Sequence, residues 1–312
     1  MVKIKILGTE SLGVRGLCCV VEVEQRKIVI DPGIALGYKR HGLLPHPVQV
    51  AVGARVRRRI LAELEDATDV VISHFHGDHV PLPKANPYQL SAQQAAPLLR
   101  ARRLWAKGPE GLSNHMQRRR ASLAETLGRE LPNVEGQCDG PLTFSPALPH
   151  GEPGTHLGTV MMTRVTDETT VFVHASDIQL LDGQAVSCIL DWHPDVALVS
   201  GPPLYLGAFM GRQRRERAWE NAQRLARHVE TLILDHHLLR CKEGLAWLDR
   251  LSCESGHRVI CAADWMGQRR RLLEAQRVQL YKEMPVADGW HRAYARGDAD
   301  LDAYRLEERS TG

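Results

Sequence analysis

At positions 73 to 79 the chain reads Ser73-His74-Phe75-His76-Gly77-Asp78-His79, which places three imidazoles and one carboxylate within six consecutive residues. Neutral imidazole nitrogens and carboxylate oxygens are the ligands that a borderline cation such as Zn²⁺ prefers. The apolar run just before it, residues 67 to 72, indicates a buried strand. Alternation along an extended chain directs His74 and His76 to one face, while Asp78 and His79 lie past the strand end. One short loop can therefore bind two ions. The alternative is a His-rich surface loop that binds metal adventitiously.

The composition is that of a soluble globular protein. The chain has 312 residues, of which 43% are hydrophobic and 25% charged, and we expect a single domain over residues 1–312. No apolar run is long enough to cross a membrane, and residues 1 to 6 read as an edge strand and not as a signal peptide. The seven cysteines include no CxxC pair, which favours reduced thiols. These features predict a cytoplasmic protein that does not insert into membranes.

The apolar pattern predicts two sheets covered by helices. Before residue 175 the expected strands mostly follow one another, and after it they alternate with helices. We expect strands at residues 2–7, 18–30, 142–148, 159–166, 170–174, 196–200, 231–234 and 259–262, and helices at 56–65 and 212–229. Residues 80–141 read as a helical insert, with helices at 92–103 and 115–127, and residues 266–312 as a basic helical tail.

The motif His74-Phe75-His76-Gly77-Asp78-His79 resembles the HxHxDH signature of the metallo-β-lactamase superfamily and matches it at every specified position. The resemblance covers roughly residues 1 to 265 and is weakest in the insert. It implies an α/β fold, a four-layer αββα sandwich with two metal ions in the cleft at the sheet edges. The sequence is similar to an uncharacterised branch of predicted metal-dependent hydrolases in this superfamily, which does not name a substrate.

The resemblance also implies the remaining metal ligands. His150 after an expected strand fits the third histidine better than His156, and Asp177 fits the bridging aspartate better than Asp167 or Asp182. His236 fits the last ligand, with its neighbour His237 as a substrate-facing candidate. One ion would then be held by His74, His76 and His150, and the other by Asp78, His79 and His236, with Asp177 between them.

Six further residues are candidates around this site. Asp31 would accept an imidazole N–H and orient a ligand histidine, or alternatively open the Asp-Pro-Gly turn. His237 could donate a proton to the leaving group and Arg240 could clamp a phosphate or carboxylate. In the alternative interpretation His237 packs and Arg240 caps its loop. Tyr205, with Thr155 and His156, is a candidate lining residue by loop position only.

The expected activity is hydrolysis by a dinuclear site with a metal-bridging hydroxide, in which Asp78, Asp177 and His237 act directly. The expected cofactors are two divalent ions, Zn²⁺ before Mn²⁺ or Fe²⁺.

Arginines at 118–120 and at 212, 214, 215 and 217 favour an anionic phosphodiester substrate, unless they form solvated helix faces. Lactone or thioester hydrolysis and a non-catalytic, metal-stabilised binding subunit are the alternatives. A nucleic-acid partner is only weakly supported, because the net charge is only +3 and aromatic residues that could stack on bases are few. The sequence leaves open whether the protein forms a homo-oligomer.

Overall fold

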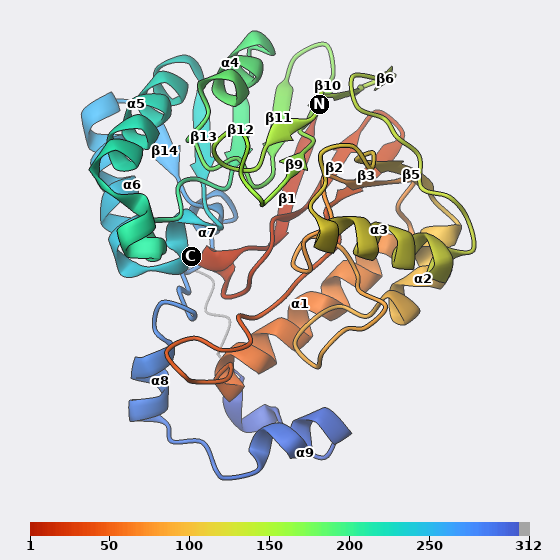
Figure 1. Ribbon diagram of the computed structural model, residues 1–312, viewed down its shortest axis with the longest axis vertical. Helices are drawn as coiled ribbons and strands as arrows, with labels where there is room; N and C mark the ends of the chain where they lie inside the picture. Colours follow the sequence, from red (N-terminus) through yellow and green to blue (C-terminus); the bar gives the residue numbers. More distant parts are fainter. Residues whose placement is uncertain (306–312) are drawn as a thin grey trace.

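The computed structural model describes residues 1–305 and contains two β-sheets that lie against each other (Figure 1). The first sheet has the order β1 (Lys3–Gly8), β2 (Cys18–Val23), β3 (Arg26–Ile30), β4 (Asp69–Ile72) and β5 (Arg103–Ala106). The second has the order β14 (Arg258–Ile260), β13 (Thr231–Leu234), β12 (Val196–Val199), β11 (Val171–Ala175), β10 (Thr163–Thr166), β7 (Leu142–Phe144) and β6 (Cys138–Asp139). The strands β8 (Leu148–Pro149) and β9 (Thr159–Val160) form a separate short pair. As expected, β1 is an edge strand.

Helices cover the outer face of each sheet (Figure 1). The first sheet packs against α1 (Pro47–Glu65), α2 (Ala92–Arg100) and α3 (Asn114–Leu127). The second packs against α4 (Gly183–Asp191), α5 (Arg212–His228) and α6 (Lys242–Ser255). The order helix, sheet, sheet, helix confirms the predicted four-layer αββα sandwich.

Strand β2 illustrates how the sequence pattern builds these layers. Successive side chains of a strand point to opposite faces. Cys19 and Val21 pack into the core between the two sheets, whereas Cys18 and Val20 pack in the core beneath the helices of the first sheet. Both cysteines are buried thiols, and burial raises their pKa above the ordinary range. Apolar residues on both faces therefore place this strand in the interior of the sandwich.

Two element boundaries differ from the sequence-based expectation. The helix expected from Val56 begins at Pro47, because the His46 ring accepts the N–H of Val48 at 3.2 Å and the Gln49 side chain accepts the N–H of His46 at 3.0 Å. Residues 80–141 are more than a helical cap, since they also contribute β5, which pairs in parallel with β4. This strand has only four residues, too few for a clear pattern in the sequence.

A buried carboxylate joins β3, β4 and β5. Asp69 on β4 accepts hydrogen bonds from Arg26 at 2.7 and 3.0 Å and from the Trp105 indole at 2.8 Å. Burial by itself would raise the pKa of Asp69, but the hydrogen bonds from Arg26 and Thr68 outweigh it and lower the pKa below the usual range. The ionised carboxylate thus holds three neighbouring strands together.

We expect Asp69→Asn to lower the free energy of unfolding by about 2 kcal/mol at pH 7, because charge-assisted hydrogen bonds are lost. A carboxyl whose pKa is lowered in the folded state stabilises above its unfolded pKa, and this contribution disappears as the pH falls through the folded pKa. The difference between variant and parent should therefore shrink below about pH 4. Denaturant titrations at several pH values measure it, with the exposed Asp298→Asn as control. A difference that does not change with pH would contradict this explanation.

The C-terminal segment packs on α1 and on the loop before it (Figure 1). It contains α8 (Arg277–Glu283) and α9 (Trp290–Arg296), and it is preceded by α7 (Ala262–Trp265), which lies against β13. Arg277 is fully buried and donates to the backbone oxygens of Gly37 at 2.6 Å and Leu43 at 3.1 Å and to the Gln49 side chain at 3.0 Å. Within the tail predicted over residues 266–312 the structure has the helices α8 and α9 and the short helical turn Asp302–Tyr304; residues 306–312 lie outside the described residues.

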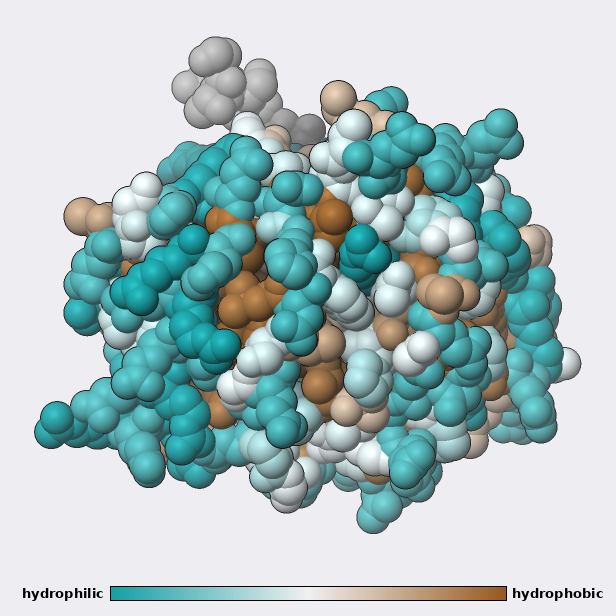
Figure 2. All heavy atoms as spheres, turned by 90° about the horizontal axis from the view of Figure 1, so that it is seen from above, coloured by the Kyte–Doolittle hydropathy of each residue, from teal (hydrophilic) through white to brown (hydrophobic). Residues whose placement is uncertain are grey.

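The molecular surface is mainly polar. Figure 2 shows hydrophilic side chains over most of the upper face, with hydrophobic residues visible in depressions between them. Among the helices of residues 1–305, none combines the length and the apolar character that crossing a bilayer requires.

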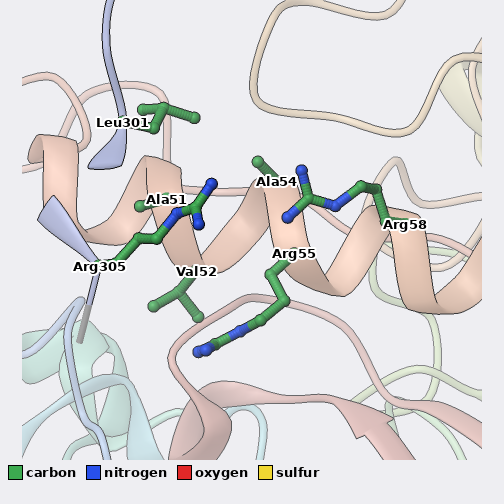
Figure 3. A pocket seen from close by; sticks show the side chains of 7 residues that line it. All are labelled: Ala51, Val52, Ala54, Arg55, Arg58, Leu301 and Arg305. Atoms are coloured by element: carbon green, nitrogen blue, oxygen red, sulfur yellow. The ribbon is translucent and has the colours of Figure 1, made fainter. Parts of the chain in front are cut away.

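A surface pocket of about 170 Å³ lies beside α1 (Figure 3). Its lining includes the side chains of Arg55, Arg58 and Arg305 together with small and apolar residues of α1. None of its lining residues belongs to the site predicted from the sequence, so the site has to be located from the positions of the histidines and aspartates themselves.

Candidate metal centre

Strand ends bring the predicted site residues together. The His74–His79 loop follows β4, His150 follows β8, Asp177 lies two residues past β11, and His236 and His237 follow β13 by two and three residues. Because β11, β12 and β13 run parallel, their carboxyl ends lie at the same edge of the second sheet. The loop after β4 meets that edge from the first sheet, and all seven predicted ligands converge there.

Four side chains form a first cluster. Asp177 Oδ2 lies 2.7 Å from His150 Nε2, 3.1 Å from His74 Nε2 and 3.3 Å from His76 Nδ1. His74 Nε2 and His76 Nδ1 are 3.1 Å apart. Ligand atoms about 2.0 to 2.2 Å from a tetrahedral ion lie about 3.3 to 3.6 Å from one another. The separations of 2.7 to 3.3 Å in the first cluster are equal to or shorter than this, so these atoms are close enough to hold one divalent ion after moving slightly apart.

A second cluster lies on the other side of the same carboxylate. Asp177 Oδ1 is 3.1 Å from His79 Nε2 and 3.3 Å from His236 Nε2, and the two imidazole nitrogens are 3.2 Å apart. The Asp78 carboxylate completes the group, with Oδ2 3.6 Å from His236 Nε2 and Oδ1 4.0 Å from His79 Nε2. The two oxygens of Asp177 thus face different clusters, as a carboxylate between two ions would.

Burial and charge match these clusters to a cation. Burial and the nearby His79 lower the pKa of His74 to about 3, and burial and Arg240 lower the pKa of His236 to about 4, so both rings are neutral at pH 7. Burial by itself would raise the pKa of Asp177, but His79 and the other surrounding imidazoles outweigh it and lower the pKa well below the usual range. Burial by itself would lower the pKa of His79, but Asp177 and Asp78 outweigh it and raise the pKa well above the usual range. This ring is therefore protonated when no ion is bound and would release its proton to a divalent ion, which binds neutral imidazoles beside ionised carboxylates.

Asp31 lies behind the second cluster. Its carboxylate accepts the backbone N–H of Ser73 at 2.8 Å and the Ser73 hydroxyl at 2.6 Å, and Oδ2 lies 3.1 Å from His79 Nδ1. The turn that follows is closed by a backbone bond from Gly33 N–H to the Asp31 carbonyl oxygen at 2.7 Å. The carboxylate is therefore directed at the His loop and not at the turn. This geometry favours a role in orienting His79.

The outward nitrogens of two other rings are held in the same way. His74 Nδ1 lies 2.9 Å from the Ser73 hydroxyl, and His150 Nδ1 lies 3.1 Å from the Gln179 amide. Such contacts fix the orientation of a ring and direct its other nitrogen inward. The sequence analysis did not single out Ser73 or Gln179, although each lies one or two residues from a predicted ligand.

We expect Asp31→Asn to weaken metal affinity about 10- to 100-fold, because an amide orients and polarises the His79 ring less than a carboxylate does. Asn tolerates the left-handed backbone of residue 31, which has φ of 49°. Ion release against a competing chelator measures the effect, and thermal unfolding of the metal-free protein serves as the control for folding. Unchanged metal affinity would mean that Asp31 only supports the loop backbone.

The adjacent histidines of the last loop reach different oxygens of Asp177. His236 faces Oδ1, whereas His237 Nε2 lies 3.7 Å from Oδ2, on the side of the first cluster. Neighbouring side chains of an extended chain diverge, but the left-handed φ of 39° at His236 brings both rings to the same carboxylate. His237 Nδ1 is buried and has no hydrogen-bond partner among the described residues. His237 also forms a group with Asp177 and His236 that could hold an ion, so the choice of His236 as ligand and His237 as the substrate-facing residue stays a prediction.

Arg240 is engaged by the fold. It is buried and donates to Glu10 at 2.8 Å, to the Tyr205 hydroxyl at 3.0 Å and to Asp78 Oδ2 at 3.2 Å. A guanidinium bound by these three groups has little capacity left to clamp a substrate. The arrangement favours the alternative that Arg240 holds its loop, and it assigns Tyr205 to the same network.

Asp235 is a site residue that the sequence analysis missed. Its buried carboxylate accepts from the Thr9 hydroxyl at 2.5 Å and from the backbone N–H groups of Ser11 and Ala262, each at 3.0 Å. It therefore ties three separate segments together directly before the two histidines. A carboxylate at the end of an apolar strand was the available signal, but its partners lie more than twenty residues away and cannot be recognised from the sequence.

The weaker rivals for the ligand positions have other roles. Asp182 caps α4 by accepting the N–H groups of Gln184 and Ala185. Asp167 pairs with the N-terminal ammonium at 2.7 Å. His156 belongs to neither cluster in the described residues.

The two arginine groups, predicted either to contact an anionic substrate or to form solvated helix faces, have partners within the fold. On α5, Arg214 and Arg217 pair with Glu152, Arg215 with Glu243 and Arg212 with Glu216. In α3 the three arginines donate to backbone oxygens of Asn114, Phe75 and Leu131. Two of these pairings join residues four apart on one helix, Arg212 with Glu216 and Arg118 with Asn114, and the spacing along the chain shows them. The others join different elements that come together only on folding, so the sequence does not reveal them.

Comparison with known proteins places the chain in a family. Residues 13–186 match the metallo-beta-lactamase superfamily. A UPF0282 protein of Methanosarcina mazei is 54% identical over 304 residues, covering 97% of this chain and 100% of the relative. A UPF0282 protein of Thermococcus gammatolerans is 37% identical over 290 residues, covering 88% and 94% of the two chains.

Solved structures with a similar fold are more distant. A metal-dependent hydrolase of the beta-lactamase superfamily, Tm1679, is 14% identical with a TM-score of 0.48 and covers 84% of this chain and 96% of its own. AidC, a dizinc quorum-quenching lactonase, is 13% identical with a TM-score of 0.38 and covers 72% of each chain. From the family match and the full-length relatives, the chain belongs to the metallo-β-lactamase superfamily of hydrolase folds and, within it, to the UPF0282 proteins.

Proposed function

We propose that this chain is a metal-dependent hydrolase that holds two divalent ions, with Zn²⁺ preferred over Mn²⁺ and Fe²⁺. The observation that carries the proposal is the position of Asp177, whose two carboxylate oxygens each face a separate group of imidazoles at 2.7 to 3.3 Å. In this proposal the ligands are those predicted from the sequence: His74, His76 and His150 on one side, Asp78, His79 and His236 on the other, and Asp177 between them.

The chemistry follows from the burial of the groups. Two bound ions would polarise an ester or phosphoryl oxygen and lower the pKa of a water molecule. The most accessible side chains of the two clusters are His76, which is 24% exposed, and Asp78, which is 17% exposed. Substrate would therefore approach over His76 and Asp78. His237, whose Nδ1 lacks a partner among the described residues, is the candidate for contact with the leaving group.

For the substrate we propose a phosphodiester, with a lactone or a thioester as the alternative. Two ions that share one carboxylate can stabilise both the entering and the leaving oxygen of a displacement at phosphorus. The arginine groups no longer support this choice, because they form ion pairs with carboxylates and hydrogen bonds with backbone oxygens of the same chain. The proposal of a phosphodiester therefore rests on the paired clusters alone.

Metal content and a substrate panel test the proposal. Protein purified without a nickel column is loaded with Zn²⁺ or Mn²⁺ and assayed on bis(p-nitrophenyl) phosphate, a simple lactone and a thioester, with Asp177→Ala as the inactive control. We expect two ions per chain and turnover of the phosphodiester. Turnover of the lactone or the thioester alone would replace the substrate class. Two bound ions without any turnover would favour a metal-stabilised binding subunit, and a chain that binds no ion would refute the proposal.

A further inference from the structure

The two clusters differ in their charged surroundings. The first is built from three imidazoles and one oxygen of Asp177, and no Arg or Lys among residues 1–305 is hydrogen bonded to the side chains of His74, His76 or His150. The second contains an additional carboxylate, Asp78, and is in direct contact with a guanidinium. An Arg240 nitrogen lies 3.2 Å from Asp78 Oδ2 and 2.7 Å from His236 Nε2.

Arg240 leaves room for an ion in the second cluster. The nitrogen that lies 2.7 Å from His236 Nε2 is also 3.3 Å from Nδ1 of the same ring. A group on the axis of the Nε2 lone pair would be much farther from Nδ1, since that axis points away from the ring. The guanidinium therefore lies over the ring and not on the lone pair that an ion would use.

Arg240 is also held firmly in this position. Its Nε donates to Glu10, and Arg40 donates to the Arg240 carbonyl oxygen at 2.8 Å. The guanidinium carbons of Arg40 and Arg240 each lie 5.4 Å from the centroid of the Tyr205 ring. A buried arginine stays charged. The second cluster thus has a permanent positive charge beside its own carboxylate.

We propose that Arg240 shares the Asp78 carboxylate with the ion of the second cluster and makes that position bind its ion more weakly than the first. The inference rests on the proposed two-metal function. A fixed positive charge a few ångströms from a divalent cation opposes its binding, and the effect is large where water is excluded. One oxygen of Asp78 also accepts a hydrogen bond from the guanidinium. In the first cluster no ligand atom is shared with an arginine or lysine among the described residues.

The test measures the two affinities separately. Zn²⁺ is titrated into the metal-free protein in competition with a fluorescent chelator, and Asp78→Asn and His150→Ala variants identify which constant belongs to which cluster. We expect the second constant of the parent protein to be at least about tenfold weaker than the first. Equal constants in the parent protein would overturn the inference.

Variants of Arg240 separate charge from position. In Arg240→Met we expect the second ion to bind about tenfold more tightly while the first constant is unchanged; in Arg240→Lys, which keeps the charge, the gap should remain. Arg250→Met on the exposed face of α6 is the matched control and should change neither constant. Weaker second binding in both Arg240 variants would show that Arg240 serves only to position Asp78, against the inference.

A second variant tests whether loss of folding explains the result in Arg240→Met. It also changes Glu10, the carboxylate that pairs with Arg240. Burial and the carboxylate of Glu274 raise the pKa of Glu10 to about 8, so this side chain can take up a proton when the guanidinium is removed. The double variant Glu10→Gln with Arg240→Met removes the whole buried pair and carries the same expectation if the single variant is unstable. Unequal constants without any hydrolysis would contradict the proposed function alone, and equal constants with hydrolysis would contradict this inference alone.

Discussion

Asp177→Asn is expected to lower hydrolysis about a thousandfold or more and to reduce the bound metal from two ions to one or none. The substitution keeps the shape of the side chain but removes the charge that both imidazole clusters share. Asp177 is buried, and each of its oxygens is within 3.3 Å of at least two imidazole nitrogens. Losing a charge that stabilises a reaction centre in a water-excluded site costs orders of magnitude in rate. Metal analysis and steady-state kinetics on the active substrate measure both effects.

A matched aspartate serves as the control for Asp177. Asp182 lies in the same loop region but caps α4, where Asn is an equally good cap. Asp182→Asn should therefore keep both metal content and turnover. If Asp177→Asn retained two tightly bound ions, the carboxylate would not lie between them, and the proposed arrangement of the centre would be wrong.

Gly33→Ala is expected to destabilise the protein by about 3 kcal/mol and to release metal, although residue 33 has no side chain and is not a ligand. A Cβ atom at this position would lie 2.1 Å from Val80 N and 2.2 Å from the His79 carbonyl carbon. Both are backbone atoms of the loop that carries four predicted ligands, so the loop itself must move. Because productive metal geometry tolerates shifts of only about half an ångström, metal affinity should fall together with stability.

The control for Gly33 is a glycine with space around it. At Gly183, the first residue of α4, an added methyl group would have no neighbouring atom within 4 Å, and Gly183→Ala should change neither stability nor metal binding by a measurable amount. Chemical denaturation and chelator competition on both variants measure the effects. A stable Gly33→Ala protein with normal metal affinity would show that the loop can adjust, and would remove this glycine from the description of the centre.

Much of the centre was predictable because its ligands are local or follow strands. The HxHxDH motif supplies four ligands in one loop, and a His or Asp after an apolar run marks the end of a strand. The resemblance to the metallo-β-lactamase superfamily implied Asp177 and His236, and in the structure parallel strands of one sheet bring these residues to one edge. The fold class follows from the same pattern, since β2 and its neighbours are apolar on both faces.

Other predictions failed where the answer depends on partners that are distant in the chain. The arginines of α5 looked available for phosphate, but Glu152 and Glu243 come to lie opposite them. Strand β5 was missed inside the insert because four residues carry little periodicity, and its position is set by pairing with β4.

The sequence by itself therefore determined the chemical inventory of this protein: which side chains can bind metal, and on which strand ends they lie. Only the tertiary structure decided how that inventory is arranged, with Asp177 between two clusters, His236 and His237 on different oxygens, and Arg240 directed at Asp78. The physical reason is the distance along the chain over which each property is set. Side-chain type and strand alternation are properties of neighbouring residues, whereas a buried charge takes its partner from whichever segment packs against it.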